Sequence, residues 1–205
     1  MRPRVVGGEA LLIELDSATE VAALHAELLR RREAGELDGV RDVVPASRTV
    51  LLDGVREPHA LAERVVRWVV APLAETEGPL VTVPVRYDGP DLSVVARLWG
   101  VAEQEVPVIV GGTAFRVAFC GFAPGFGYLT GLPERFHLPR RDTPRTAVPA
   151  GSLALAGEYA GVYPRCSPGG WQLIGTTDAV LWDPHRIPAA LFTPGARVRF
   201  EEVAG

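Results

Sequence analysis

The residues best suited to chemistry lie in one glycine- and proline-rich stretch, residues 121–177 of the 205-residue chain. This stretch holds ten glycines and seven prolines, and aromatic residues are interleaved throughout it. Glycine lets a backbone approach a ligand closely, proline fixes the direction of the chain, and aromatic rings supply apolar walls. Each residue alone is also explained by a tight turn, but together they predict a shaped binding surface.

Three arginines, Arg140, Arg141 and Arg145, lie in a part of this stretch where proline recurs every five residues. A backbone stiffened by proline can hold guanidinium groups in place, and fixed guanidinium groups bind carboxylate or phosphate through paired hydrogen bonds. The pattern therefore predicts an anion site. The alternative is a solvated loop whose arginines pair with Asp142 or with a partner.

The segment Ser167-Pro-Gly-Gly-Trp could present consecutive backbone N–H groups to an oxyanion, or it could be a plain hairpin turn before a strand. Glu158 and Tyr163 flank the same loops and are the candidates for acid–base catalysis, although an isolated carboxylate is usually solvated. The predicted substrate- or anion-binding residues are Pro124, Gly125, Phe126, Arg140, Arg141, Arg145, Ser152, Tyr163, Ser167, Gly169, Gly170, Trp171, Thr176 and Thr177.

Several catalytic classes are excluded by residue types that the chain lacks. All 21 basic residues are arginine, so neither a phosphate-loop lysine nor a Schiff-base lysine is available. The chain contains no His-Glu-x-x-His, Cys-x-x-Cys or Gly-x-Ser-x-Gly motif. The four histidines are not paired at metal-ligand spacing, so no metal site is predicted.

Charge and hydropathy narrow the partners and the compartment. The net charge of −4 argues against a nucleic-acid surface, and no apolar run approaches the length of a membrane span. The first residues lack the features of a signal peptide, and two cysteines imply no disulfide framework. Cys120 lies in an apolar run and is predicted to be a buried, inert thiol. These features predict a cytoplasmic protein.

Strand and helix patterns alternate in residues 1–80. The expected order is β-α-β-β-α-β, which is typical of a ferredoxin-like α+β domain. A boundary is expected near residue 80, in the polar segment 75–79 with its Gly-Pro pair. The elements expected are strands at Ala10–Leu15, Val40–Val44, Thr49–Leu52 and Leu80–Val85, with helices beginning after Ser17 and near Pro58.

Residues 81–205 begin with a helix, for which Asp91 is the expected N-cap and Gly100 the C-terminal stop. Beyond Gly112 only short strand-like runs separated by turns follow. Regularly spaced short strands of this kind predict a β-barrel or a sandwich.

Five motifs appear in order: Gly121-Phe-Ala-Pro-Gly-Phe-Gly-Tyr-Leu, Pro139-Arg-Arg-Asp-Thr-Pro-Arg, Val148-Pro-Ala-Gly-Ser, Gly161-Val-Tyr-Pro and Ser167-Pro-Gly-Gly-Trp-Gln-Leu-Ile-Gly. Together they resemble the PxpB/KipI family, also called allophanate hydrolase subunit 1. The resemblance covers nearly the whole chain. It implies a small α+β N-terminal domain followed by a cyclophilin-like β-barrel.

The resemblance also implies a complex with a PxpC-type subunit (allophanate hydrolase subunit 2) and a PxpA-type subunit. Such complexes open the cyclic amide 5-oxoproline to glutamate at the expense of ATP. Because the chain has no lysine and no phosphate loop, ATP is expected to be shared with or bound by a partner, and the chain alone is not expected to be active. The alternatives are a KipI-type regulator that inhibits a histidine kinase, and a subunit acting on another amide such as allophanate.

The chain departs from the family pattern at three positions. Val110 stands where a histidine is common, Tyr159 where a glutamine is frequent, and Thr176 where an arginine is usual. These departures are expected to bear on the substrate or on the division of chemistry between subunits, and not on the fold.

Overall fold

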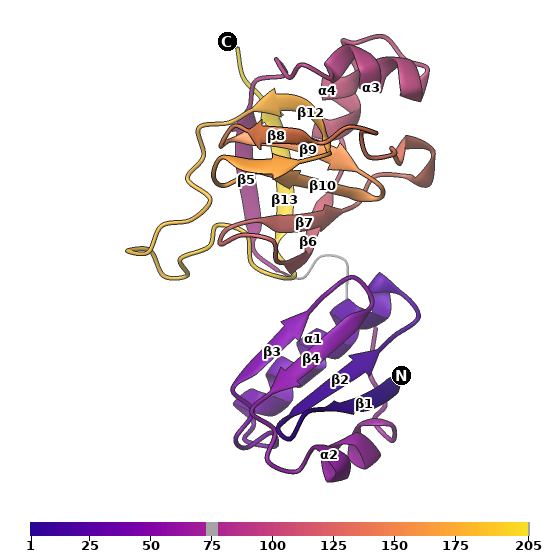
Figure 1. Ribbon diagram of the computed structural model, residues 1–205, viewed down its shortest axis with the longest axis vertical. Coiled ribbons are helices and arrows are strands. Elements are labelled where there is room, and N and C mark those ends of the chain that lie inside the picture. Colours follow the sequence, from indigo (N-terminus) through magenta and orange to yellow (C-terminus); the bar gives the residue numbers. More distant parts are fainter. Residues whose placement is uncertain (73–77, 205) are drawn as a thin grey trace. The chain divides into compact units, whose positions relative to one another are not determined.

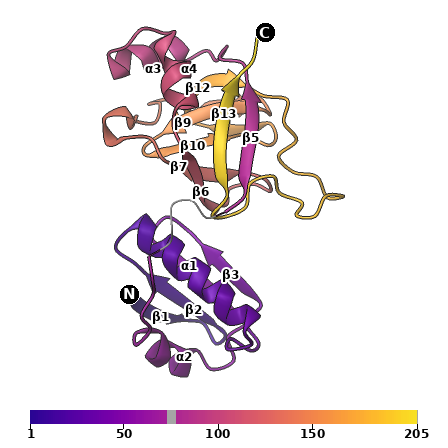
Figure 2. The same cartoon turned by 180° about the vertical axis from the view of Figure 1, so that it is seen from behind.

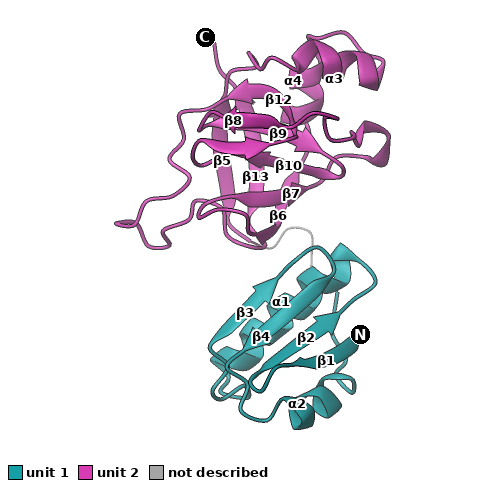
Figure 3. Ribbon diagram, viewed as in Figure 1, with its two compact units in different colours: residues 1–77 teal, residues 78–205 magenta. Residues whose placement is uncertain are grey.

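The computed structural model describes residues 1–72 and 78–204. The chain divides into two compact units, residues 1–77 and 78–205, each with its own hydrophobic core (Figure 3). The boundary expected from the sequence lay near residue 80. Residues 75–77 of the segment predicted to carry it lie outside the described residues.

Unit 1 is a four-stranded antiparallel sheet with two helices (Figure 1). Leu11 pairs with Leu52 and Ile13 with Val50, so all four side chains lie on one face of the sheet, where both helices pack. Figure 2 shows α1 lying across this face. The elements are β1 (Arg2–Val6), β2 (Ala10–Glu14), α1 (Ala18–Glu33), β3 (Asp42–Pro45), β4 (Thr49–Asp53) and α2 (Pro58–Val65), in the sheet order β1-β2-β4-β3.

The first helix begins where the sequence predicts it. The Ser17 hydroxyl accepts a hydrogen bond from the backbone N–H of Glu20 at 3.2 Å. The Glu20 carboxylate in turn accepts from the N–H of Asp16 at 3.0 Å, one residue before the expected Ser17 amide. Two of the four unpaired N–H groups near the helix start are thereby satisfied.

One predicted strand belongs to the other unit. Leu80–Val85 was expected to complete the sheet of the first domain, but it forms β5 of the barrel. The fourth strand of unit 1 is β1, which pairs with β2 from Arg2 opposite Glu14 onward. Its exposed charged residues and Pro3 hid it, because the apolar alternation that indicates a strand is weak there.

Unit 2 is a nearly closed β-barrel built on a seven-stranded sheet in the order β12-β9-β10-β7-β6-β13-β5. A separate two-stranded sheet pairs β11 with β8. The elements are β5 (Leu80–Val85), α3 (Leu92–Trp99), α4 (Glu105–Gly111), β6 (Phe115–Cys120), β7 (Gly127–Thr130), η1 (Glu134–Phe136), β8 (Arg145–Val148), β9 (Ser152–Ala156), β10 (Tyr159–Val162), β11 (Ser167–Gly169), β12 (Gln172–Thr176) and β13 (Arg197–Glu202).

The barrel closes where the chain after β5 meets β12. The N–H of Arg86 donates to the carbonyl of Thr176 at 2.9 Å, and the N–H of Thr176 donates to the carbonyl of Arg86 at 2.8 Å. Gly175 permits this approach, because a side chain there would overlap the carbonyl oxygen of Arg86. The predicted fold class, α+β with a small N-terminal domain followed by a β-barrel, is confirmed.

Two apolar clusters fill unit 2. The larger one occupies the barrel and includes the rings of Phe115 and Phe200, whose centroids lie 5.3 Å apart. The smaller one gathers Phe126, Tyr163 and Trp171 with aliphatic residues of β8, β9 and β12. This aromatic cluster forms the floor of the candidate functional site.

Candidate functional site

A cavity of about 340 Å³ lies at the surface of unit 2, inside the stretch that the sequence singles out. Its volume is in the range typical of small-molecule sites. Segments far apart in the sequence meet there: the turn between β6 and β7, the loop between η1 and β8, the end of β10, and the chain around β11. The lining residues are Phe122, Phe126, Tyr128, Arg140, Pro144, Tyr163, Pro168, Gly169, Gly170 and Trp171.

Phe126 organises the aromatic wall of the cavity. Its ring meets those of Tyr128, Tyr163 and Trp171 in edge-to-face geometry, with centroid distances of 5.0, 5.4 and 5.5 Å. Such contacts stabilise aromatic clusters beyond the burial of their area. Gly161 makes the packing possible, because a Cβ at this position would lie 2.9 Å from the Phe126 ring.

Phe122 is the one non-glycine residue with positive φ (66°) in the described part of the chain. A left-handed backbone costs an L-residue roughly 1–2 kcal/mol, so an opposing interaction must hold it. The Phe122 ring packs edge-on against Phe126 and Tyr163, at 5.3 and 6.1 Å, yet more than half of the residue remains exposed. A strained, exposed aromatic residue at a cavity is typical of a functional site.

The three predicted arginines have different roles. Arg141 and Arg145 each donate to one carboxylate oxygen of Asp91, Oδ1, at 2.8 Å. Arg140 lines the cavity, and within residues 1–72 and 78–204 it makes no hydrogen bond or ion pair. The guanidinium available to a ligand is therefore that of Arg140, while those of Arg141 and Arg145 hold the loop to the barrel.

Asp91 anchors this arrangement although it lies before α3, far from the arginines in sequence. It is 2% exposed, and its second oxygen, Oδ2, accepts from the N–H of Leu173 at 2.7 Å. Burial acts to raise the pKa of Asp91, but the hydrogen bonds from Arg145 and Leu173 and the charges of both arginines outweigh it and hold that pKa below its usual value. The predicted N-cap role is wrong, because the side chain makes no hydrogen bond to the helix start.

The two candidates for acid–base catalysis are placed differently. Tyr163 lines the cavity, and burial raises its pKa, with the charge of Arg140 opposing the rise. Its hydroxyl is therefore protonated at neutral pH and suited to donate a hydrogen bond. Glu158 lies on the exposed turn between β9 and β10 and does not line the cavity.

Six of the predicted binding residues line the cavity: Phe126, Arg140, Tyr163, Gly169, Gly170 and Trp171. The other eight do not. Ser152 and Ser167 donate to nearby backbone carbonyls, those of Pro149 and Arg165. Thr176 binds the carboxylate of Asp88, and the Thr177 hydroxyl accepts from the N–H of Ala179. The remaining four are Arg141 and Arg145, bound to Asp91, and Pro124 and Gly125, in the turn between β6 and β7.

Sequence reasoning missed four of the lining residues, Phe122, Tyr128, Pro144 and Pro168. All four stand in the motifs quoted above, so the motifs located the site, but only the fold shows which side chains reach it. The segment predicted as an oxyanion nest contributes as β11, whose Pro168 and Gly169 form part of the cavity wall.

The three positions that depart from the family pattern lie outside the cavity lining. Val110 is fully buried in the barrel core, and Thr176 forms part of the barrel closure. Tyr159 packs edge-on against Tyr128, with ring centroids 5.6 Å apart, so it touches a lining residue from behind.

We expect the two cysteines to differ strongly in reactivity. Cys120 is half-buried, its thiol donates to the carbonyl of Phe192, and burial raises its pKa to about 11, whereas Cys166 is exposed. Because the thiolate is the nucleophile, Ellman's reagent at pH 8 should label one thiol rapidly and the second only on unfolding. The variant Cys166→Ser should lose the rapid phase. Two thiols reacting at one rate in the native protein would contradict this expectation.

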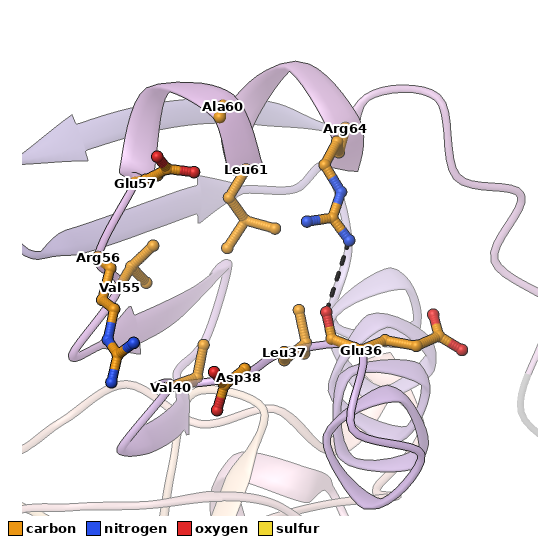
Figure 4. Close-up of a pocket in the computed structure, with 10 residues that line it drawn as sticks. All are labelled: Glu36, Leu37, Asp38, Val40, Val55, Arg56, Glu57, Ala60, Leu61 and Arg64. Carbon is orange, nitrogen blue, oxygen red and sulfur yellow. Dashed lines mark hydrogen bonds between the residues drawn. The ribbon is translucent and has the colours of Figure 1, made fainter.

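Unit 1 carries a larger cavity, of about 420 Å³, between α2 and the chain that follows α1 (Figure 4). Exposed side chains of both charges border an apolar floor, and Arg64 donates to the backbone carbonyl of Glu36 at a long 3.5 Å. None of the predicted site residues lies there. Mixed exposed charges without converging donors define no ligand chemistry, so the aromatic cavity of unit 2 is the candidate site.

Within the described residues, no group of three or more His, Cys, Asp or Glu side chains is placed to hold a metal ion. In the same residues no helix has the length and apolar character needed to cross a membrane.

The fold and the sequence define a class of protein. Residues 1–192 match the family described as the carboxyltransferase domain, subdomains C and D. A solved structure, that of TTHA0988, superposes with a TM-score of 0.78 at 35% identity, and the match covers 96% of this chain but only 40% of that one. Urea carboxylase of Kluyveromyces lactis shares the fold, with a TM-score of 0.72 at 18% identity.

Curated relatives specify the branch of that class. A protein of Escherichia coli O157:H7 that is named as a subunit of 5-oxoprolinase is 38% identical over 204 residues, which cover 96% of this chain and 93% of the relative. A Bacillus subtilis protein of the same name is also 38% identical, over 75% of this chain and 67% of the relative. The chain belongs to the PxpB family of carboxyltransferase C and D subdomains.

Proposed function

We propose that this chain is the amide-binding subunit of an ATP-dependent hydrolase complex that opens 5-oxoproline to glutamate. The names of its relatives support a subunit of such an enzyme. The observation that carries the proposal is the free guanidinium of Arg140 at an aromatic cavity, beside neighbouring arginines that are bound to Asp91.

The cavity suits a small ring that bears a carboxylate. The rings of Phe126, Tyr163 and Trp171 supply apolar walls for the flat face of a cyclic amide. Arg140 supplies a cation for its carboxylate through charge-assisted hydrogen bonds. The protonated hydroxyl of Tyr163 is a donor for the amide oxygen, on which negative charge accumulates when the amide is attacked.

The residues of this chain do not fit an ATP site of their own. The chain has no lysine, and two of the three arginines near the cavity are bound to a buried carboxylate. The proposal therefore assigns ATP to a PxpC-type partner or to a surface shared with it, and completes the enzyme with a PxpA-type subunit.

Reconstitution tests the proposal. The chain is purified with its PxpC-type and PxpA-type subunits, and ATP hydrolysis is measured with and without 5-oxoproline. We expect turnover that requires both 5-oxoproline and this chain. The proposal fails if the three subunits together show no 5-oxoproline-dependent ATP hydrolysis, or if the rate is unchanged when this chain is omitted.

A further inference from the structure

The loop between β12 and β13 has an inverted distribution of side chains. In Figure 1 this segment extends away from the barrel. At its tip Ile187 is 99% exposed, and Val180 and Trp182 are also largely exposed. Arg186, by contrast, is turned inward. Single exposed apolar residues are ordinary, but three on one projecting loop form a patch that requires explanation.

Arg186 makes this loop rigid. Its guanidinium donates to four backbone carbonyls, those of Val180, Leu181, Pro188 and Ala189, at 3.0–3.4 Å. The N–H of Asp183 also donates to Ala189, and the N–H of Leu191 to Leu181. A loop ordered in advance loses little conformational entropy on binding, which is the property of a preformed docking element.

The loop is joined to the candidate site by direct packing. Gly125 has a left-handed φ of 84°, and a Cβ there would lie 2.9 Å from the Cβ of Trp182 and 3.0 Å from the carbonyl oxygen of Leu181. Gly125 belongs to the turn that also carries Phe122 and Phe126 into the cavity. A protein seated on this loop is therefore brought next to the cavity.

From these observations we propose that residues 180–190 form the docking element for the PxpC-type partner, with Ile187 entering an apolar pocket of that protein. This inference rests on the proposed function. A protein is the fitting occupant because relatives of this chain are either named as one subunit of an enzyme or, like TTHA0988, form 40% of a longer chain. The guanidinium of Arg186 is engaged within the loop, which leaves an apolar tip suited to an uncharged pocket and not to nucleic acid.

Replacing Ile187 with aspartate tests this docking. Because the side chain is almost fully exposed, Ile187→Asp should fold as the wild type does, which circular dichroism would check. Its affinity for the purified PxpC-type subunit, measured by biolayer interferometry, should fall at least roughly tenfold, because a hot-spot contact is replaced by a buried charge. The matched control is Val69→Asp, at a valine of unit 1 that is 92% exposed, and it should bind as the wild type does.

The outcomes separate this inference from the proposed function. If the wild-type complex forms and turns over 5-oxoproline but Ile187→Asp binds equally well, the docking inference is overturned and the function stands. If the substitution changes only self-association of the chain, seen by sedimentation, the occupant is a second copy and the inference is again overturned. If the wild-type chain does not bind the PxpC-type subunit at all, both fail.

Discussion

Asp91→Asn is expected to lower the free energy of unfolding of the barrel unit by about 3 kcal/mol, the scale for removing one partner of a buried ion pair. The carboxylate receives two guanidinium hydrogen bonds on Oδ1 and the Leu173 N–H on Oδ2. An amide NH₂ in either place would face a donor, so one buried contact becomes repulsive. Urea denaturation followed by tryptophan fluorescence measures the loss.

Asp178→Asn is the matched control, because Asp178 makes the same kind of pair with Arg86 but is 85% exposed. Its effect should be much smaller, since exposed pairs contribute little. The pKa of Asp91 is lowered in the folded state, so its contribution to stability is complete above the ordinary aspartate pKa of about 4 and is lost as the pH falls through the lowered value. The difference between wild type and Asp91→Asn should therefore shrink below about pH 4. Equal losses in the two variants at pH 7 would contradict the anchoring role of Asp91.

Arg140→Ala is expected to leave the fold intact and to impair the assembled enzyme. Arg140 is exposed and has no partner within the described residues, so the stability change should stay within about 0.5 kcal/mol. If it holds the carboxylate of the cyclic amide, kcat/KM for 5-oxoproline should fall roughly 10- to 100-fold, which is the effect of losing one hydrogen bond to a charged group. The fall should appear mainly as a higher KM.

Two further variants sharpen this result. Arg140→Lys keeps the charge but not the planar pair of donors, so it should restore only part of the activity. Arg199→Ala removes an exposed arginine of β13, away from the cavity lining, and should be neutral. An Arg140→Ala enzyme with unchanged kcat/KM would remove Arg140 from the site, whatever the activity of the complex.

Local signals in the sequence located most elements of the fold. The run Ser152–Ala156 is a strand with the predicted bounds, Ser17 caps α1, and Gly100 ends α3 with a left-handed φ of 68°. Each of these depends on residues that are neighbours in the chain. Val180–Trp182 was wrongly predicted as a strand, because its apolar run belongs to a loop stabilised by Arg186.

The candidate site was predictable as a region and not as a set of side chains. Arg141 and Arg145 are bound by a carboxylate 50 and 54 residues away, and no local pattern shows that pairing. Arg140 and Arg141 are adjacent, yet one lines the cavity and the other faces Asp91. Which neighbour points in which direction depends on the barrel, whose closure brings Asp91 next to β12.

The pairing of β5 with β13 has a consequence for how the protein folds during its synthesis. Leu80 opens unit 2 and lies opposite Arg197, so the first strand of the barrel has no parallel neighbour until the last one leaves the ribosome. Every contact of the unit 1 sheet, in contrast, lies within residues that are translated earlier. Because domains fold as units in the order of their synthesis and non-local pairing is slow, unit 1 should be native while the barrel is still open.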